Sequence, residues 1–584
     1  MSILTPMVQF NSKQVWKSIV GDQGPQWESW AQDFVDRYPD VLRDIELIKR
    51  FEEKGRAGMY PSRVGIVFFT TNTGQNLPVG IMVSHHEGDG VFLYHKDYLA
   101  SDGIALSARM PKREEPIALF PKLGMEREPN MMTFIANRGT ESWNAFLQAI
   151  SLGQIYPDDM VELQKEQAQK KKDQHSPKLR HVYSDYAEFQ RLLTFGRDIP
   201  GAFWVMDIDL DPEVERKHNE AVHRAATAGR NVLSGAQPKL SGICTKNNNY
   251  YPARFDEITR MVQPSTHIFK IGSRESKNQP TIIAEFLAME ATRALIPDDE
   301  VEEGKIVELT LSNDMKIPAL ALTRFDRLPN GGRRHFTEMT ELLGLTSENK
   351  YEGSYWYMAK VLNPEGEIKG PRYEQTKLLF RRIVAGLMVG NFDNHFKNFA
   401  VFNDTRTLTP NYDIQATDMF GGKKTALWIK DNRVEDQNIL SATLVRLGVE
   451  MGITFEDMRT IFDAFKKVLP AAEERVKNAK IDEHIIEESA VDPIRKELGD
   501  NIAARFQKWE RRCDFNSAID AAKKEWGARA QNGIDILPPF KAPLYRQFAP
   551  ERLGAEKLIL SKSGQEPYDG IPNEIFSNVA SASR

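Results

Sequence analysis

The sequence predicts an α+β fold with a β-rich first part and a helical second part. Short apolar runs separated by turn residues begin near Arg63, and amphipathic helical periodicity dominates after Tyr351. Between these parts, one helix-periodic segment lies among strand-like runs. The 584 residues are 41% hydrophobic and 27% charged, which excludes collagen-like, wholly disordered and disulfide-scaffold proteins.

Charge and cysteine content limit the partners and the compartment. The chain has 77 basic and 82 acidic residues and a net charge of -5, so it has no global attraction to nucleic acid or anionic lipid. Its two cysteines, Cys244 and Cys513, cannot build a disulfide framework or a Cys-based zinc site, which favours a reducing compartment. No apolar stretch is long enough to span a bilayer. We therefore predict a cytoplasmic protein with no membrane partner.

Two segments make up the first part. Residues 1–55 are predicted to be a charged, helical N-terminal extension with apolar surface at Trp16, Trp27 and Trp30. Residues 56–225 are predicted to be a β-rich subdomain, because the run VGIVFFTT leads into a turn at TNTGQN and two further apolar runs flank the turn EGDG, which predicts a hairpin. A helix is expected at 141–152. The polar stretch LQKEQAQKKKDQHSPK is expected to be a linker or an exposed helix.

Residues 226–350 are predicted to be a second β-containing region. The run FWVMDIDL (203–210), which precedes this region, and the runs STHIFKIG and KIPALALTRFD within it have the length and apolar content of strands in a second sheet. The segment TIIAEFLAMEATRALI has helical spacing instead. Its predicted apolar face comprises Ile282, Ile283, Phe286, Leu287, Ala291 and Leu295.

Residues 351–526 are predicted to be a helical lobe, and residues 527–584 an irregular, proline-containing C-terminal extension. In EQTKLLFRRIVAGLMVG the apolar side chains recur with the helical period, and Gly390 ends the pattern as a C-terminal breaker. The recurring residues are Leu378, Leu379, Ile383, Val384, Leu387 and Met388. The middle of the chain thus passes from a small sheet with one helix to a helical half, the order of kinase-type bilobal folds.

The segment GNFDNHFKNFAVFN is the most informative for chemistry. Asp393 stands five positions before Asn398, and Asp413 follows fifteen residues later, beyond a strand-like run and a turn. Phosphoryl transfer needs one carboxylate to accept the proton of the attacking hydroxyl, and oxygen ligands for magnesium. Lys397 would place a positive charge near the transferred group. Alternatively, Asp393 and Asn398 could cap a helix or close a turn.

Weaker signals lie upstream and within this loop. The segment NVLSGAQPKLSG carries glycines and the donors Ser234, Lys239 and Ser241, which suit a phosphate-binding loop or an ordinary turn. Lys270 lies in an apolar strand, either to meet nucleotide phosphates or to reach solvent from an edge strand. The helical Glu285 could orient this lysine, although an ordinary structural role is favoured for it. The imidazole of His395 could hydrogen-bond the aspartates or serve only the fold.

At these residues the sequence resembles the HipA family of Ser/Thr kinases, the toxins of bacterial toxin-antitoxin modules. The resemblance implies an α+β, bilobal, protein-kinase-like fold of the HipA type and covers about residues 60 to 520. It implies a HipA-like N-terminal subdomain at 56–225, an ATP-binding region like a kinase N-lobe at 226–350 and a helical catalytic C-lobe at 351–526. Its motifs occur in the family's order. They are SGAQPKL (234–240), HIFKIG (267–272), LTRFDR (322–327), KYEG (350–353), GNFDNHFKNFAVF (390–402) and LTPNYDI (408–414).

The resemblance implies a role for each matching position. Asp393 would be the catalytic base, Asn398 and Asp413 the magnesium ligands, and Lys270 the lysine on the ATP phosphates. The predicted phosphate-covering loop comprises Ser234, Gly235, Ala236, Gln237 and Lys239. In the predicted hinge, the backbone near Thr323 and Phe325 would meet the adenine, although family members often have glutamate where Thr323 stands.

The resemblance also suggests regulation and partners. Many family members are silenced by phosphorylation of a serine just before the phosphate loop. The closest position here is Val232, and Ser234 and Ser241 are nearby candidates. The expected partner is a HipB-like helix-turn-helix antitoxin, through which any contact with DNA would be indirect.

The leading hypothesis is an ATP- and magnesium-dependent Ser/Thr protein kinase that arrests growth. In the best-known branch of the family the target is an aminoacyl-tRNA synthetase. Two alternatives are a kinase-fold binding or regulatory protein that acts through a DNA-bound antitoxin, and a small-molecule phosphotransferase. Competent residues at all four catalytic positions argue against lost catalysis.

Overall fold

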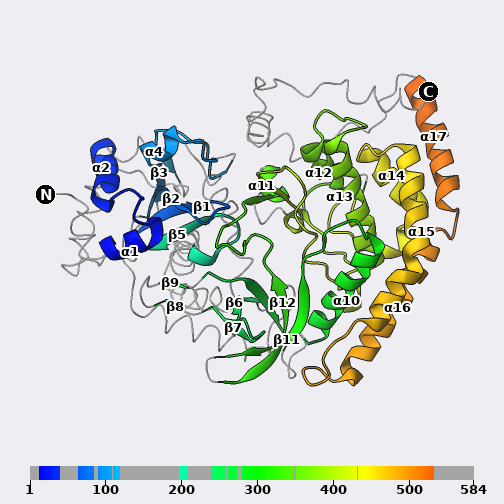
Figure 1. The fold of residues 1–584 in the computed structure, drawn as a ribbon. Helices are drawn as coiled ribbons and strands as arrows, with labels where there is room; N and C mark the ends of the chain where they lie inside the picture. The colour runs from blue at the N-terminus through cyan, green and yellow to red at the C-terminus, as the bar shows by residue number, and fades with distance from the viewer. Residues whose placement is uncertain are drawn as a thin grey trace, which may run out of the picture. The chain divides into compact units, whose positions relative to one another are not determined.

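The computed structural model describes residues 12–39, 63–84, 90–107, 110–118, 196–207, 239–253, 255–256, 261–262, 264–272, 279–311, 314–343, 345, 350–429 and 432–531 (Figure 1). The chain divides into two compact units. Unit 1 comprises Met1–Glu275, Glu308–Ile317 and Thr323–Phe336, and unit 2 comprises Ser276–Val307, Pro318–Leu322 and Thr337–Arg584. The predicted change from a strand-rich first part to a helical second part is confirmed in the element order.

Unit 1 contains a five-stranded antiparallel sheet with the order β4-β3-β2-β1-β5. The predicted turn at TNTGQN joins β1 to β2, and the runs on either side of EGDG pair as β2 and β3, with Ser84 opposite Gly90. The strands are β1 (Arg63–Thr70), β2 (Asn76–Ser84), β3 (Gly90–Tyr94), β4 (Ile117–Ala118) and β5 (Phe203–Asp207).

The prediction that FWVMDIDL belongs to a second sheet is wrong. This run forms β5, which pairs antiparallel with β1 in the first sheet, with Val205 opposite Val67. The ring of Trp204 stacks on that of Phe68, with centroids 4.4 Å apart. An apolar run of strand length does not specify its neighbour, because pairing is set by the side chains that it meets across the sheet.

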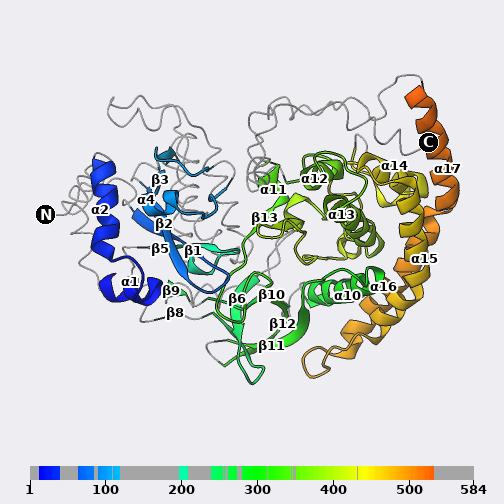
Figure 2. The same cartoon turned by 45° about the horizontal axis from the view of Figure 1, so that its top comes forward.

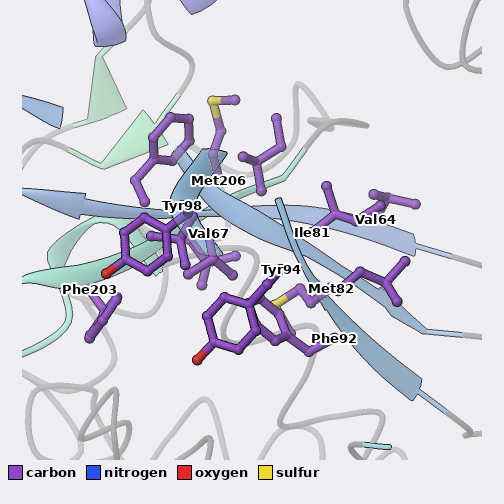
Figure 3. Packing of buried hydrophobic residues seen from close by; sticks show 14 of the residues in the cluster. Val64, Val67, Ile81, Met82, Phe92, Tyr94, Tyr98, Phe203 and Met206 are labelled. Atoms are coloured by element: carbon purple, nitrogen blue, oxygen red, sulfur yellow. The ribbon is translucent and has the colours of Figure 1, made fainter. Parts of the chain in front are cut away.

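The first two described helices, α1 (Ser12–Val20) and α2 (Trp27–Arg37), belong to the same hydrophobic core as this sheet. The rings of Trp16 and Phe68 lie 5.6 Å apart, and Trp30 stacks on His95 at 5.0 Å. Figure 3 shows part of this core, with Val67, Ile81 and Met82 of the sheet among its labelled residues. The predicted N-terminal extension is therefore packed into the subdomain over the residues that the structure describes.

A buried carboxylate also fixes α2. The carboxylate of Asp33 accepts hydrogen bonds from Arg37 Nη1 at 2.8 Å and from the backbone amide of Lys96 at 3.1 Å. Lys96 begins the short helix α4 (Lys96–Ala100), which follows β3. Asp33 is only 3% exposed. Its hydrogen bonds therefore orient α2 against the start of α4, in addition to the non-directional apolar packing.

The second sheet is a closed barrel with the order β10-β12-β11-β7-β6. It contains the runs STHIFKIG and KIPALALTRFD, as predicted for a second sheet. The barrel strands are β6 (Lys239–Cys244), β7 (Tyr250–Pro252), β10 (His267–Ile271), β11 (Gly304–Thr310) and β12 (Lys316–Thr323). A separate short pair is made by β8 (Phe255–Asp256) and β9 (Met261–Val262).

A buried charge network stabilises unit 1. Arg324 donates from Nη1 to Asp198 Oδ1 at 3.1 Å and to Ser265 Oγ at 2.9 Å, and from Nη2 to Asp326 Oδ2 at 2.9 Å. Arg327 Nη1 adds a hydrogen bond to Asp326 Oδ2 at 2.7 Å. Burial alone would raise the pKa of Asp326, but Arg324 and Arg327 outweigh it and hold that pKa below its ordinary value. The network joins the one-turn helix η2 (Gly196–Asp198) to the segment after β12.

Unit 2 is mainly helical (Figure 2). Its helices are α10 (Gln279–Leu295), α11 (Met339–Leu342), α12 (Tyr355–Leu362), α13 (Pro371–Met388), α14 (Ser441–Glu450), α15 (Phe455–Asn478), α16 (Glu488–Trp509) and α17 (Phe515–Gln531). The strands β13 (Phe336–Glu338) and β14 (Ala400–Phe402) pair with each other. Within the described ranges, no helix has the length and apolar character needed to cross a bilayer.

The predicted apolar faces of α10 and α13 are buried, apart from Leu378, which is half-buried. Pro371 starts α13 at a position where its missing amide costs nothing. The extension predicted to begin at residue 527 is helical in its first residues, because α17 continues to Gln531. Its remainder, residues 532–584, the helix predicted at 141–152 and the polar stretch after that helix lie outside the described residues.

Candidate active site

The candidate catalytic loop begins where α13 ends. The amide of Val389 donates to the carbonyl of Ala385 at 3.0 Å and closes the last helical turn. Gly390 follows with φ at +81°, in the left-handed region that favours glycine, as the sequence predicted for a helix breaker. The chain then leaves the helix axis and enters the loop that carries Asp393.

The segment around Thr417 and Asp418 forms hydrogen bonds with the start of this loop. The amide of Phe392 donates to Thr417 Oγ1 at 2.9 Å, and the amide of Asp418 donates to the carbonyl of Gly390 at 3.1 Å. From α16, Arg505 hydrogen-bonds the carboxylate of Asp418 and, through Nη1, donates to the carbonyl of Met388 at 2.7 Å. Burial raises the pKa of Asp418, although Arg505 opposes this effect.

Substitution of Gly390 by alanine is expected to lower the free energy of unfolding by about 1–3 kcal/mol, because an L-residue is strained at this φ. The new Cβ would also overlap the partly buried Asp418 carboxylate. Gly452→Ala is the matched control, since Gly452 has φ at +78° but nothing within 4 Å of the added Cβ. Chemical denaturation of both variants measures the difference. Equal losses would contradict a role for the Asp418 contact.

Asp393 and Asn398 are brought together by the loop. Asn398 Nδ2 donates to the backbone carbonyl of Asp393 at 2.9 Å, and the amide of His395 donates to the same carbonyl at 2.9 Å. Asn398 ends the one-turn helix η4 (Phe396–Asn398), and β14 follows, as the predicted helix, loop and strand order requires. The Asp393 carboxylate accepts a hydrogen bond from the hydroxyl of Tyr351 at 2.8 Å. The five-residue spacing therefore forms a closed, hydrogen-bonded loop.

Asp413 has a backbone conformation that is uncommon for its type. Its φ is +56°, a region that costs a non-glycine residue about 1–3 kcal/mol and is concentrated at functional sites. Gln415 Nε2 donates to Asp413 Oδ1 at 3.0 Å and orients the carboxylate. The preceding Tyr412 donates from its hydroxyl to the carbonyl of Lys397 at 2.7 Å, which ties this segment to the catalytic loop.

A divalent cation could be held by Asn398 and Asp413. Among the residues that the structure describes, no group of three or more His, Cys, Asp and Glu side chains could hold a metal. An amide oxygen and one carboxylate suit magnesium, which takes its other ligands from water and from substrate phosphates. This donor set fits magnesium and does not fit zinc.

Lys397 lies beside a buried carboxylate that the sequence did not reveal. Its Nζ is 3.7 Å from Oε2 of Glu338, which is fully buried on β13. Burial raises the pKa of Glu338, while Lys397, Thr340 and Lys350 act in the opposite direction. The pairing of β13 with β14, which are far apart in sequence, brings Glu338 to the loop.

His395 is neutral at physiological pH. Burial, aided by Lys350 and Lys397, lowers the pKa of this imidazole to about 3, against the opposing effect of Asp413. Its Nδ1 is buried and has no hydrogen-bond partner within the described part of the chain. The hydrogen bond from His395 to the aspartates that the sequence suggested is therefore not made by this nitrogen.

The other predicted nucleotide contacts that the structure describes belong to unit 1. Lys270 on β10 lies directly opposite Lys239 on β6 and is 2% exposed, which excludes a lysine that reaches solvent from an edge strand. His267 and Phe269 share the other face of β10, as predicted, with parallel rings 6.1 Å apart.

In the predicted hinge, Thr323 Oγ1 lies 3.5 Å from His267 Nε2, and the rings of Phe325 and Phe336 are 5.2 Å apart. Glu285, on α10 in unit 2, is 1% exposed. Ser234, Gly235, Ala236 and Gln237 lie outside the described residues.

Comparison with known proteins gives consistent matches. Residues 232–473 match the family model HipA_C, the HipA-like C-terminal domain. A curated protein of Sinorhizobium fredii (strain NBRC 101917 / NGR234), named "Putative kinase Y4dM", is 28% identical over 311 residues, which cover 49% of this chain and 72% of that protein. A chain in the solved complex of the Shewanella oneidensis MR-1 toxin-antitoxin system, HipA, HipB and its operator DNA, aligns with a TM-score of 0.52 and 18% identity. This alignment covers 78% of the present chain and 98% of the other, and it shows a shared fold. The present chain therefore contains a HipA-like C-terminal domain at residues 232–473 and shares the fold of a HipA toxin-antitoxin structure.

Proposed function

We propose that this chain is an ATP- and magnesium-dependent kinase that phosphorylates serine or threonine on a protein target and thereby arrests growth. The observation that carries the proposal is the hydrogen-bonded loop from Asp393 to Asn398, tied through Tyr412 to Asp413. It supplies a carboxylate for proton transfer together with two oxygen ligands for a cation. Phosphoryl transfer requires this combination.

Each residue has a role in the proposed reaction. The Asp393 carboxylate orients the acceptor hydroxyl and accepts its proton as the oxygen attacks the γ-phosphorus, while the bond from that phosphorus to the β–γ bridging oxygen breaks and ADP leaves. Asn398 and Asp413 hold the cation, and Gln415 fixes the orientation of the Asp413 carboxylate. Bound magnesium would neutralise charge on the phosphate oxygens. Lys397 contributes positive charge to the loop, moderated by the neighbouring Glu338.

Nucleotide binding is proposed for unit 1. Lys239 and Lys270 present two ammonium groups from directly opposed positions of β6 and β10, an arrangement suited to phosphate oxygens. The segment Ser234–Gln237 would cover these phosphates, and the backbone near Thr323 and Phe325 would contact the adenine. Separately, in unit 2, the Nδ1 atom of His395, buried without a partner in the described structure, is a candidate for a contact with nucleotide.

The proposed partner is a HipB-like antitoxin. The Shewanella oneidensis complex contains HipA, HipB and operator DNA, and the present chain shares the fold of one of its chains. The net charge of -5 favours indirect contact with DNA through such a partner. We propose a cytoplasmic setting, with an aminoacyl-tRNA synthetase or another translation component as the protein target.

Phosphate transfer from ATP labelled at the γ-position, in the presence of a cell extract, tests this function. Labelled protein that disappears when EDTA removes magnesium is the expected result, together with growth arrest on expression of the chain. Label confined to small molecules would refute the protein target. An absence of labelled product, combined with tight binding to a small DNA-binding protein, would instead indicate a binding protein.

A further inference from the structure

Tyr351 contacts the proposed catalytic base directly. Its hydroxyl donates to Asp393 Oδ1 at 2.8 Å, although the two residues are 42 positions apart in the chain. Tyr351 belongs to the KYEG segment that precedes α12, whereas Asp393 lies in the loop after α13. A long-range hydrogen bond from a phenol to this carboxylate is not needed to close the catalytic loop, which has its own internal hydrogen bonds.

The ring of Tyr351 is held from several directions. Lys350 Nζ lies 4.9 Å from the ring centroid, and the guanidinium carbon of Arg433 lies 5.1 Å from it. The ring of His395 approaches nearly perpendicularly, with centroids 5.0 Å apart. Arg433 Nη2 also donates to the backbone carbonyl of Tyr351 at 3.2 Å. Contacts with two cations and a second ring restrict the ring, so the hydroxyl is presented to Asp393 from a defined position.

The direction of this hydrogen bond is fixed by the ionisation of its partners. Burial raises the pKa of Tyr351, and the neighbouring Asp393 raises it further, so the phenol keeps its proton over the physiological range. The phenol proton is donated to Asp393. A donor on a carboxylate stabilises the ionised form, which is the form that a general base needs before it takes a proton.

We infer that Tyr351 is a positioning residue for Asp393, and this inference rests on the function proposed above. The terminal torsion of an aspartate is broad, so one carboxylate alone samples many orientations. The Tyr351 hydroxyl anchors Oδ1 and thereby sets the plane of the carboxylate toward the acceptor hydroxyl. The contacts of Lys350 and Arg433 with the Tyr351 ring hold its hydroxyl in a fixed position.

Tyr351→Phe tests the inference, because it keeps the ring and its cation contacts but removes the hydroxyl. Losing a hydrogen bond to a charged group is expected to lower kcat about 10- to 100-fold. The KM for ATP should stay unchanged, since Tyr351 acts on the base. The acidic limb of the pH-rate profile should move to higher pH, because the ionised carboxylate has lost a donor.

Two further variants separate positioning from stability. Tyr373→Phe is the matched control, since the Tyr373 hydroxyl donates to Asp457 Oδ2 at 2.6 Å within the same unit. It should lower the melting temperature without changing kcat or the pH-rate profile. Arg433→Gln keeps the Tyr351 hydroxyl but removes the cation over the ring. It should shift kcat and the acidic limb in the same direction as Tyr351→Phe, by a smaller amount.

The outcomes distinguish this inference from the proposed function. If Asp393→Asn abolishes transfer while Tyr351→Phe and Arg433→Gln both behave like Tyr373→Phe, the positioning role is wrong and the kinase function stands. If Asp393→Asn transfers phosphate at the normal rate, Asp393 is not the base and the positioning role fails with it, while phosphoryl transfer itself stands. If the unmodified chain transfers no phosphate, the proposed function fails. If Tyr351→Phe does not fold, the kcat and pH-rate profile of Arg433→Gln decide the question.

Discussion

Replacement of Asp393 by asparagine is expected to lower the rate of phosphoryl transfer by about 10²- to 10⁴-fold, the usual contribution of a general base. The amide has nearly the same shape as the carboxylate but cannot accept the proton of the acceptor hydroxyl. Its oxygen can still accept the hydrogen bond from Tyr351, so the local structure should persist. The measurement is the initial rate of label transfer to protein, with the melting temperature recorded in parallel.

Asp457→Asn provides the matched control for this prediction. Asp457 accepts a hydrogen bond from the Tyr373 hydroxyl and lies near Lys377, but it belongs to the first turn of α15, far along the chain from the candidate catalytic loop. We expect this variant to lose some stability and to keep its transfer rate. A rate for Asp393→Asn within a factor of a few of the unmodified chain would show that the proton is taken by another group.

Replacement of Arg324 by methionine is expected to destabilise unit 1 by about 3–5 kcal/mol, because removing one partner of a buried ion pair leaves its counterions buried without compensation. The Arg324 side chain is only 1% exposed and neutralises Asp198 and Asp326, which are themselves buried. Arg327 remains near both carboxylates and relieves only part of the loss. Methionine has a similar length, so the expected effect comes from charge and hydrogen bonding.

Hydrogen exchange of peptides that cover β1 and β5, together with thermal unfolding of the full chain, measures this loss. Arg381→Met is the matched control. Arg381 also pairs with an aspartate, Asp298, but Asp298 is largely exposed, and such pairs contribute about 0–1 kcal/mol. If the two variants lose the same stability, the network around Arg324 does not hold unit 1 together.

Local patterns predicted the core of the candidate site well. The periodic apolar face of α13, the glycine that ends it and the strand after the loop could all be identified from the sequence, because helical period and glycine φ are local properties. Their positions then placed Asp393 and Asn398 on one loop. The burial of Lys270 could not be determined from the sequence alone, because an apolar strand with one lysine is compatible with both an edge strand and a central strand.

The rest depends on contacts between distant segments. Nothing near Tyr351 in the sequence indicates a hydrogen bond to Asp393, and nothing near Glu338 indicates Lys397. The sequence predicts that LTRFDR forms a hinge strand, and it gives no sign of an ion pair for its arginines. In the structure Arg324 forms an ion pair with Asp198, 126 positions earlier. The pairing of β5 with β1 was missed for the same reason. Which distant residues or strands pair with each other is determined by the assembled fold.

The discontinuity of unit 1 has a consequence for how the chain folds during synthesis. The strand β1 ends at Thr70, but its neighbour β5 begins only at Phe203, and the counterions of Asp198 follow at Arg324 and Arg327. Contacts so distant in sequence make folding slow, since long loops must close before the contacts form. The tryptophans of α1 and α2 therefore leave the ribosome long before the sheet that buries them is complete. Until β5 has been made, at about residue 207, this apolar surface would need protection by a chaperone.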